Sequence, residues 1–308
     1  MTIAILSMQA LGADAFAAAL GESFRRHGFA MASDHGMDDA LVARGHDMSR
    51  ALFALPEEVK RRYAIPGGGG QRGYTPFGVE IAKGAAVSDL KEFWHVGRDL
   101  PAGSPDAAKM PANVWPEELP GFRETMQALF AAFDTIGNRI LAAIASNLGL
   151  PPRWFDGPVE NGNSILRLLH YPPIGPDAAG VRAEAHEDIN LITLLLGAEE
   201  SGLQLLGRDG EWIDVAPPPG ALVVNAGDML QRLTNHDLPS TTHRVVNPLP
   251  ERRGHSRYSM PFFLHLNADF LIEALPQCVS AGNPARYPPI TADAYLQERL
   301  AEIGLVTT

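Results

Sequence analysis

The stretch Ala185-His186-Glu187-Asp188-Ile189-Asn190-Leu191-Ile192-Thr193-Leu194-Leu195-Leu196 decides the fold prediction. Its second half is apolar and partly β-branched, with no Gly or Pro before Gly197, which is typical of a buried strand. Successive side chains of a strand point to opposite faces, so His186 and Asp188 are predicted to share a face. An imidazole and a carboxylate on one face are two of the three ligands of a facial iron(II) site.

The third ligand is predicted to be His243, in the segment Ser240-Thr241-Thr242-His243-Arg244-Val245. A His-x-Asp tripeptide alone is weak evidence, because it often recurs by chance. The interval between His186 and His243, however, leaves room for several antiparallel strands, which can bring the two ligand segments together at the mouth of a barrel. The sequence therefore predicts an iron site made of His186, Asp188 and His243.

A second group of residues suits a carboxylate. Arg257 and Ser259 are two residues apart on the predicted strand 256–265, so they share a face. A guanidinium fork beside a hydroxyl is a natural partner for a carboxylate. Tyr171, at the end of a predicted strand that also carries Arg167 and Leu169 on the same face, could add a second hydroxyl. A structural ion pair for Arg257 and a core position for Tyr171 are the alternatives.

Apolar residues at steps of three or four along residues 120–148 predict one long core helix, ended by Gly149 and Pro151. Apolar spacing also predicts helices near residues 13–27 and from Asp38. A further helix is predicted from Pro56, because a proline and two acids open the segment and basic residues follow towards its end. Short strands are expected at 3–6, 29–33 and 89–96, and loops at 67–70 and 101–116.

After Pro152 strand-like segments replace helices, and turn signals separate them. Eight strands at regular spacing suggest a double-sheet jelly roll, closed by a helix near 292–303. The predicted strands are 163–171, 188–196, 202–206, 211–215, 221–225, 229–234, 243–247 and 256–265. We expect an α+β, mainly β chain, with a helical N-terminal region (1–150) and a jelly-roll core with a C-terminal helix (151–308).

Composition narrows the class of protein. The chain has 308 residues, 45% hydrophobic and 20% charged, enough to bury a full core. A net charge of −11 argues against nucleic acid as a partner. A single cysteine, Cys278, fits a reducing compartment. No signal-peptide pattern and no apolar run of membrane length is recognised, so a cytoplasmic location and no membrane are expected.

Taken together, these motifs resemble the iron(II)- and 2-oxoglutarate-dependent oxygenases, in the isopenicillin N synthase-like branch. That family has a helical N-terminal region, a distorted jelly roll, and an H-x-D…H triad followed by R-x-S. The resemblance extends to Asn225-Ala226-Gly227-Asp228 and Tyr171-Pro172-Pro173 and covers nearly the whole chain. One departure is Leu169, where many relatives carry an asparagine. It puts in doubt one hydrogen bond to the cosubstrate or to water.

The resemblance implies that iron(II), 2-oxoglutarate and dioxygen are used to oxidise a small organic substrate by hydroxylation, desaturation or cyclisation. The cosubstrate would yield succinate and CO₂, with its far carboxylate on Arg257, Ser259 and Tyr171. Trp94 and Phe263 are candidates for the substrate pocket, while His35, His46 and His95 are expected in surface or core positions. The alternatives are a 2-oxoglutarate-independent iron oxidase of the same branch and a metal-bearing binding protein without turnover.

Overall fold

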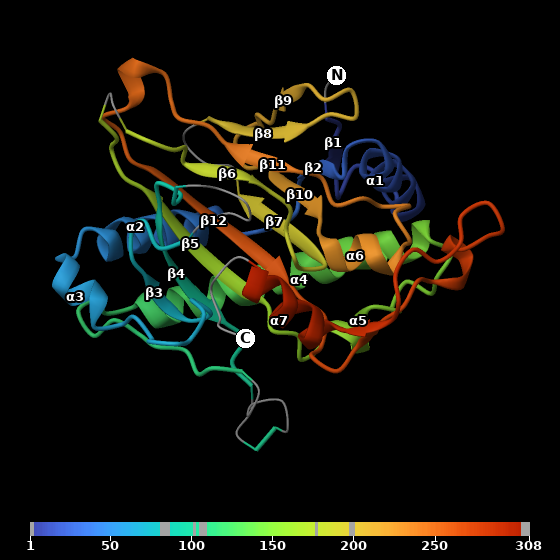
Figure 1. Cartoon of the computed structure of the whole chain (residues 1–308), viewed down its shortest axis with the longest axis horizontal. Helices are drawn as coiled ribbons and strands as arrows, with labels where there is room; N and C mark the ends of the chain where they lie inside the picture. The colour runs from blue at the N-terminus through green and yellow to red at the C-terminus, as the bar shows by residue number, and fades with distance from the viewer. Residues whose placement is uncertain are drawn as a thin grey trace.

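The computed structural model describes residues 3–80, 87–100, 103–104, 110–175, 178–196 and 201–302. Two sheets form the β part of the molecule (Figure 1). The larger sheet has eight strands in the order β1-β2-β10-β7-β12-β5-β4-β3. Their bounds are Ile5–Ser7, Phe29–Ser33, Leu222–Ala226, Ile192–Leu196, Arg257–Leu264, Ile165–Tyr171, Glu92–Gly97 and Gly73–Thr75. Apart from the parallel β1–β2 pair, neighbouring strands are antiparallel.

The smaller sheet has four strands in the order β6-β11-β8-β9, with bounds Ala183–His186, His243–Val245, Leu203–Leu206 and Trp212–Asp214. A further pair, β13 (Leu271–Ile272) and β14 (Ile290–Thr291), lies outside both sheets. Two facing antiparallel sheets form a jelly roll, as predicted. Strands from both predicted regions share the large sheet, and the division at residue 150 stays a prediction.

The helices are α1 (Ala13–His27), α2 (Asp39–Phe53), α3 (Glu57–Arg61), α4 (Phe122–Asn147), α5 (Asp156–Val159), α6 (Asp228–Leu233) and α7 (Ala292–Glu302), with short 3₁₀ turns at Pro250–Arg252 and Pro276–Cys278. The predicted long helix is therefore confirmed as α4. The predicted strand 229–234 is wrong, because this segment is α6. Its apolar residues Met229, Leu230 and Leu233 are spaced for one side of a helix, and all three are buried.

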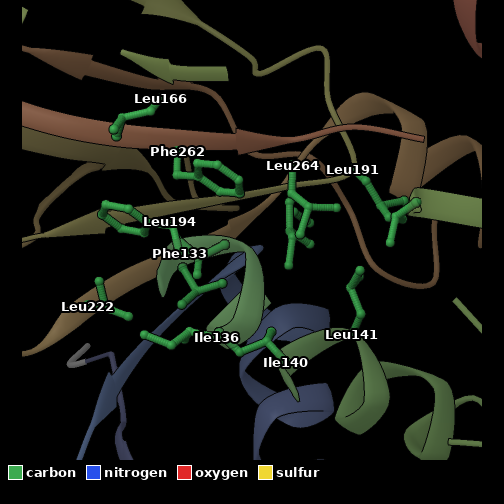
Figure 2. Close-up of a cluster of buried hydrophobic side chains, with 14 of the residues drawn as sticks. Phe133, Ile136, Ile140, Leu141, Leu166, Leu191, Leu194, Leu222, Phe262 and Leu264 are labelled. Carbon is green, nitrogen blue, oxygen red and sulfur yellow. The ribbon is translucent and has the colours of Figure 1, made fainter. Parts of the chain in front are cut away.

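The two faces of the large sheet bury different partners. One face packs against α1, α2 and α4, and Figure 2 shows Phe133 and Ile136 of α4 beside Leu194 of β7 and Phe262 of β12. The rings of Phe133 and Phe262 are stacked with centroids 5.5 Å apart. Gly137 permits this close packing, because a Cβ there would lie 2.5 Å from the Leu264 side chain.

The opposite face of the large sheet turns toward the small sheet and forms a separate, smaller cluster. It consists of Ile3, Phe29, Met31, Phe93, Leu169, Tyr171, Ala183, Leu203, Leu205, Val215, Val223 and Val245. A cavity opens on this side, and several residues of this cluster, among them Phe29, Leu169 and Val245, line it. Among the described residues, α4 is long and apolar enough to cross a membrane by length and composition alone. Its apolar residues instead pack on the sheet, as in the core helix of a folded domain.

Candidate functional site: a metal centre between the sheets

Three predicted ligands from separate segments meet at the end of the small sheet. His186 is the last residue of β6 and His243 is the first residue of β11, and the two are direct partners in the antiparallel pairing. Their rings lie 4.4 Å apart. Oδ1 of Asp188 lies 4.0 Å from Nε2 of His186 and 3.9 Å from Nε2 of His243. All three ligand atoms lie within 4.8 Å of one another.

The route by which Asp188 reaches this point corrects the sequence analysis. The stretch 185–196 is two strands, because β6 ends at His186 and β7 begins at Ile192. Between these strands, backbone carbonyls accept hydrogen bonds from the start of α6. The N–H of Asp228, for example, donates to the backbone carbonyl of Asp188 at 2.7 Å. Gly227 is required there, since a Cβ would lie 2.1 Å from the Asn190 carbonyl oxygen. Asp188 is therefore placed by a loop and not by strand alternation.

Hydrogen bonds direct one free ligand atom of each side chain toward the others. Nδ1–H of His186 donates to the Glu184 carbonyl at 2.7 Å, and Nδ1–H of His243 donates to the Thr241 carbonyl at 3.1 Å. The Nε2 lone pairs therefore face the common point. Burial, followed by the nearby His243, lowers the pKa of His186 to about 4, which favours the neutral imidazole that a metal needs.

The two oxygens of the Asp188 carboxylate likewise have different neighbours. Its Oδ2 accepts hydrogen bonds from Thr193 Oγ1 at 2.6 Å and from Asn225 Nδ2 at 2.7 Å. Oδ1 is the oxygen near the histidines. Burial alone would raise the pKa of Asp188, but the two histidines and these hydrogen bonds outweigh burial and lower it. Two imidazoles and one carboxylate, each with a hydrogen-bonded outer atom, fit iron(II).

The second predicted group lies in the same inner cavity. Arg257 pairs with Tyr171 across β12 and β5, and its guanidinium carbon lies 5.1 Å from the Tyr171 ring centre. Its Nη1 donates to Ser259 Oγ at 3.4 Å. All three residues line one cavity together with His186, Asp188 and His243. Arg257 is 3% exposed, so its charge is buried beside the candidate metal site.

An outer cavity of about 340 Å³ opens from the metal site. Its apolar wall includes Phe93, Ile165, Ile189 and Phe263, and α7 contributes Leu296 and Leu300. Gly69 and Gly70, from the glycine run that was predicted as a loop, also line it. In Figure 1, α7 lies near the arrowhead end of β12. The cavity is large enough for a small organic molecule.

A row of charged side chains crosses this cavity and was not predicted. Lys91 pairs with Asp89 at 2.7 Å and with Glu80 at 2.6 Å. Glu80 is also 3.4 Å from Arg167, whose Nε donates to His95 Nε2 at 2.5 Å. Burial would raise the pKa of Glu80, but Arg167 and Lys91 hold it well below its usual range. Burial and Arg167 lower the pKa of His95, so this row carries two positive and two negative charges and a neutral imidazole.

The structure adds to one prediction about a single residue and corrects another. His95, expected in a surface or core position, is buried and also lines the outer cavity. Trp94 was a candidate for the pocket, yet it is fully buried in the core beside α4, with its ring 5.8 Å from Phe122. Strand alternation could have predicted both positions, because Lys91, just before β4, shares a face with Phe93 and His95, whereas Trp94 points to the other face. Phe263 does line both cavities.

Comparison with known proteins adds an independent line of evidence. Residues 162–266 match the 2OG-Fe(II) oxygenase superfamily, and residues 3–118 match the N-terminal region of the non-haem dioxygenases of morphine synthesis. The chain is 35% identical to the 2-oxoglutarate-Fe(II) type oxidoreductase hxnY of Emericella nidulans over 283 residues, which cover 88% of this chain and 80% of that protein.

Solved structures agree. A 2OG-Fe(II) oxygenase family protein from Caulobacter crescentus is 56% identical, with a TM-score of 0.91 over 98% of this chain and 99% of the other. A full-length Neurospora crassa protein, solved in complex with alpha-KG and thymine, is 30% identical, with a TM-score of 0.85 over 97% and 96% of the two chains.

Proposed function

Because this chain belongs to the 2OG-Fe(II) oxygenase superfamily, we propose that His186, Asp188 and His243 hold the iron(II) of this enzyme. The protein is an oxidoreductase that uses iron(II), 2-oxoglutarate and dioxygen. The observation that carries the ligand assignment is the convergence of two Nε2 atoms and one Oδ1 atom within 4.8 Å. When bound, iron supplies the redox chemistry that couples decarboxylation of 2-oxoglutarate to substrate oxidation.

We propose further that Arg257, Ser259 and Tyr171 receive the far carboxylate of 2-oxoglutarate. A buried guanidinium gives charge-assisted hydrogen bonds to a carboxylate, and the hydroxyls of Ser259 and Tyr171 can donate to its remaining lone pairs. The shared inner cavity supports this assignment, because it runs from Arg257 to the proposed iron ligands without leaving the space between the sheets. The side chains thus orient the cosubstrate and keep bulk water from its far end.

The outer cavity is the proposed substrate site. The positive charges of Lys91 and Arg167 in its wall are matched by the negative charges of Glu80 and Asp89. A charged substrate group in this cavity would therefore lose its water and find no unmatched charge of opposite sign. Arg167 offers donors and Glu80 offers an acceptor, while Phe93 lies 4.3 Å and Phe263 lies 5.1 Å from the Arg167 guanidinium carbon. This arrangement suits a small, flat, uncharged substrate that carries both a carbonyl and an N–H or O–H group.

Anaerobic titration of the iron(II)-loaded protein with 2-oxoglutarate tests the site directly. Binding of 2-oxoglutarate to the iron should give a saturable metal-to-ligand charge-transfer band in the visible. His186→Ala should lose stoichiometric iron and the band, while His255→Ala, an exposed histidine outside both cavities, should keep them. Full iron loading of His186→Ala would remove this residue from the ligand set.

The substrate class is tested with matched pairs of flat ring compounds. Each pair consists of a neutral ring carboxamide and the carboxylate of the same ring. Succinate release is measured with each member of a pair. Neutral members should stimulate succinate release, and Arg167→Met should raise their apparent KM. Stronger stimulation by the carboxylates would overturn the proposed substrate class and would leave the iron and 2-oxoglutarate assignments intact.

A further inference from the structure

Arg182 is a buried cation for which the proposed function has no role. It immediately precedes β6, the strand that ends at His186, and its side chain is 0% exposed. Its Nη2 donates to the His255 carbonyl at 3.1 Å. Its Nε and Nη1 are buried and have no hydrogen-bond partner within the part of the chain that the structure describes. A buried guanidinium with two unused donor atoms is costly, which calls for an explanation.

Tyr171 connects Arg182 with the proposed cosubstrate site. The guanidinium carbon of Arg182 lies 5.9 Å from the Tyr171 ring centre, and that of Arg257 lies 5.1 Å from the same centre. Both distances are in the range of cation–π contacts. Two buried guanidinium groups therefore lie against one aromatic ring, and like charges held this close repel each other in a medium of low dielectric constant.

The pKa of Arg182 reflects this environment. Burial, and then the neighbouring Arg257, lowers its pKa to about 10, and Tyr171 only partly opposes this shift. The group remains protonated at neutral pH. Among the described residues no carboxylate contributes to the shift, so none of these residues supplies a negative charge at this point.

A dicarboxylate would supply the missing charge. Arg182 does not line the inner cavity, whereas Tyr171 and Arg257 do. Its effect on a bound molecule would therefore be exerted over a distance, through its electric field and through its contact with Tyr171. At separations beyond hydrogen-bond range, one charge in a poorly screened site still changes an affinity by about tenfold.

We propose that Arg182 is a positioning residue for the cosubstrate: a fixed positive charge behind Tyr171 that strengthens binding of the far carboxylate of 2-oxoglutarate. This inference rests on the proposed placement of that carboxylate at Arg257. It extends that proposal, because it makes the selection of a dicarboxylate depend on a residue outside the cavity lining.

The test compares two 2-oxo acids of equal chain length on the intact, iron(II)-loaded protein without oxygen. 2-Oxoglutarate carries the far carboxylate and 2-oxopentanoate does not, and each dissociation constant is measured from the charge-transfer band. Arg182→Met should raise the constant for 2-oxoglutarate about tenfold and leave that for 2-oxopentanoate nearly unchanged. Arg139→Met is the matched control, because Arg139 also donates to a backbone carbonyl, at 2.8 Å, but it is not one of the two arginines that contact the Tyr171 ring.

Two results would overturn the inference: an unchanged constant for 2-oxoglutarate, or an equal loss of affinity for both acids, as a purely structural role predicts. If Arg182→Met fails to load iron, Arg182→Lys decides the question. It keeps the charge but not the planar fork, so the preference for 2-oxoglutarate should survive, and its collapse would contradict a role for charge.

Arg257→Met separates this inference from the proposal on which it rests. If Arg257→Met removes the preference for 2-oxoglutarate and Arg182→Met does not, the role of Arg182 alone is wrong. If Arg257→Met also leaves the preference intact, the far carboxylate binds elsewhere and the cosubstrate assignment itself fails.

Discussion

Asn225 and Thr193 face each other across β10 and β7 and share one acceptor, Oδ2 of Asp188. Asp188 belongs to neither strand, so the two donors hold a loop carboxylate against the sheet. The hydrogen bonds occupy Oδ2 and leave Oδ1 directed at His186 and His243. The proposed metal ligand that comes from the least regular segment is therefore the one with the most side-chain support.

Removing one of these donors should weaken iron binding without removing a ligand. Thr193→Val keeps the shape of the side chain and loses the 2.6 Å hydrogen bond to Asp188. Loss of such a bond to a metal ligand typically costs roughly 10–100-fold in affinity, and we expect about tenfold. Competition with a chelator gives the dissociation constant. Thr135→Val, on the exposed side of α4, should bind iron as the wild type does; equal affinities in both variants would contradict a supporting role for Thr193.

The selection of 2-oxoglutarate should depend on the short hydroxyl beside Arg257. Ser259→Ala removes the oxygen that accepts from Arg257 Nη1 at 3.4 Å. One hydrogen bond to a charged partner contributes about 1.5–3 kcal/mol, so the dissociation constant for 2-oxoglutarate should rise by about tenfold or more. Titration of the charge-transfer band measures this change. Ser146→Ala, on the exposed part of α4, should leave the constant unaltered.

Glu92 should make the stability of the protein depend on acidity. Its carboxylate is buried and pairs with Lys60 at 2.6 Å. Burial would raise the pKa of Glu92, but hydrogen bonds from His170, Lys60 and Tyr74 outweigh it and lower the pKa. Because the pKa of Glu92 is lower in the folded state than in the unfolded state, the ionised carboxylate stabilises the folded protein. This stabilisation is fully present above the unfolded-state pKa of about 4.3. It is lost as the pH falls through the folded-state pKa.

Glu92→Gln should therefore lower the free energy of unfolding at pH 7 by about 3–5 kcal/mol, because buried Lys60 then keeps only its longer pair with the half-exposed Glu57, at 3.3 Å. The difference from the wild type should shrink below about pH 4. Denaturant unfolding at several pH values measures both effects. Glu22→Gln, which breaks an exposed pair with Arg26, should change stability by less than about 1 kcal/mol. A pH-independent difference for Glu92→Gln would count against the pKa argument.

The core face of β12 should control stability without controlling chemistry. Phe262 is fully buried between Phe130 and Phe133 of α4, with ring centres 5.0 and 5.5 Å away. Phe262→Ala should cost about 3–5 kcal/mol of unfolding free energy. The folded fraction should still bind iron and 2-oxoglutarate, because Phe262 points away from both cavities. A loss of iron affinity in protein shown to be folded would contradict this separation.

Much of the architecture could be predicted because its signals are local. The steps of three and four from Phe122 to Ile144 predict one long helix, and the structure confirms it as α4. Spacing of two predicts that Arg257 and Ser259 share a face, and they line one cavity. His186, Asp188 and His243, the predicted ligands, also lie close together in the structure.

The rest depends on contacts that no local pattern carries. The break between His186 and Ile192 arises because the intervening carbonyls bond to the loop at Gly227, which is remote in sequence. The charged row requires residues from three segments, Glu80, Lys91 and Arg167, and each alone resembles an ordinary surface charge. Arg182 gave no sequence signal, because nothing local distinguishes a buried arginine from an exposed one.

The division of β5 into two faces has a consequence for how such an enzyme can change. Leu166 and Leu168 pack in the core cluster with the helices, while Arg167, Leu169 and Tyr171 face the cavities. A point mutation at the second set can recruit a different substrate and leave the core untouched. Insertion of a single residue would exchange the two sets and damage both. Divergence of activity on this scaffold should therefore proceed by substitution within its strands, with changes of length confined to the loops.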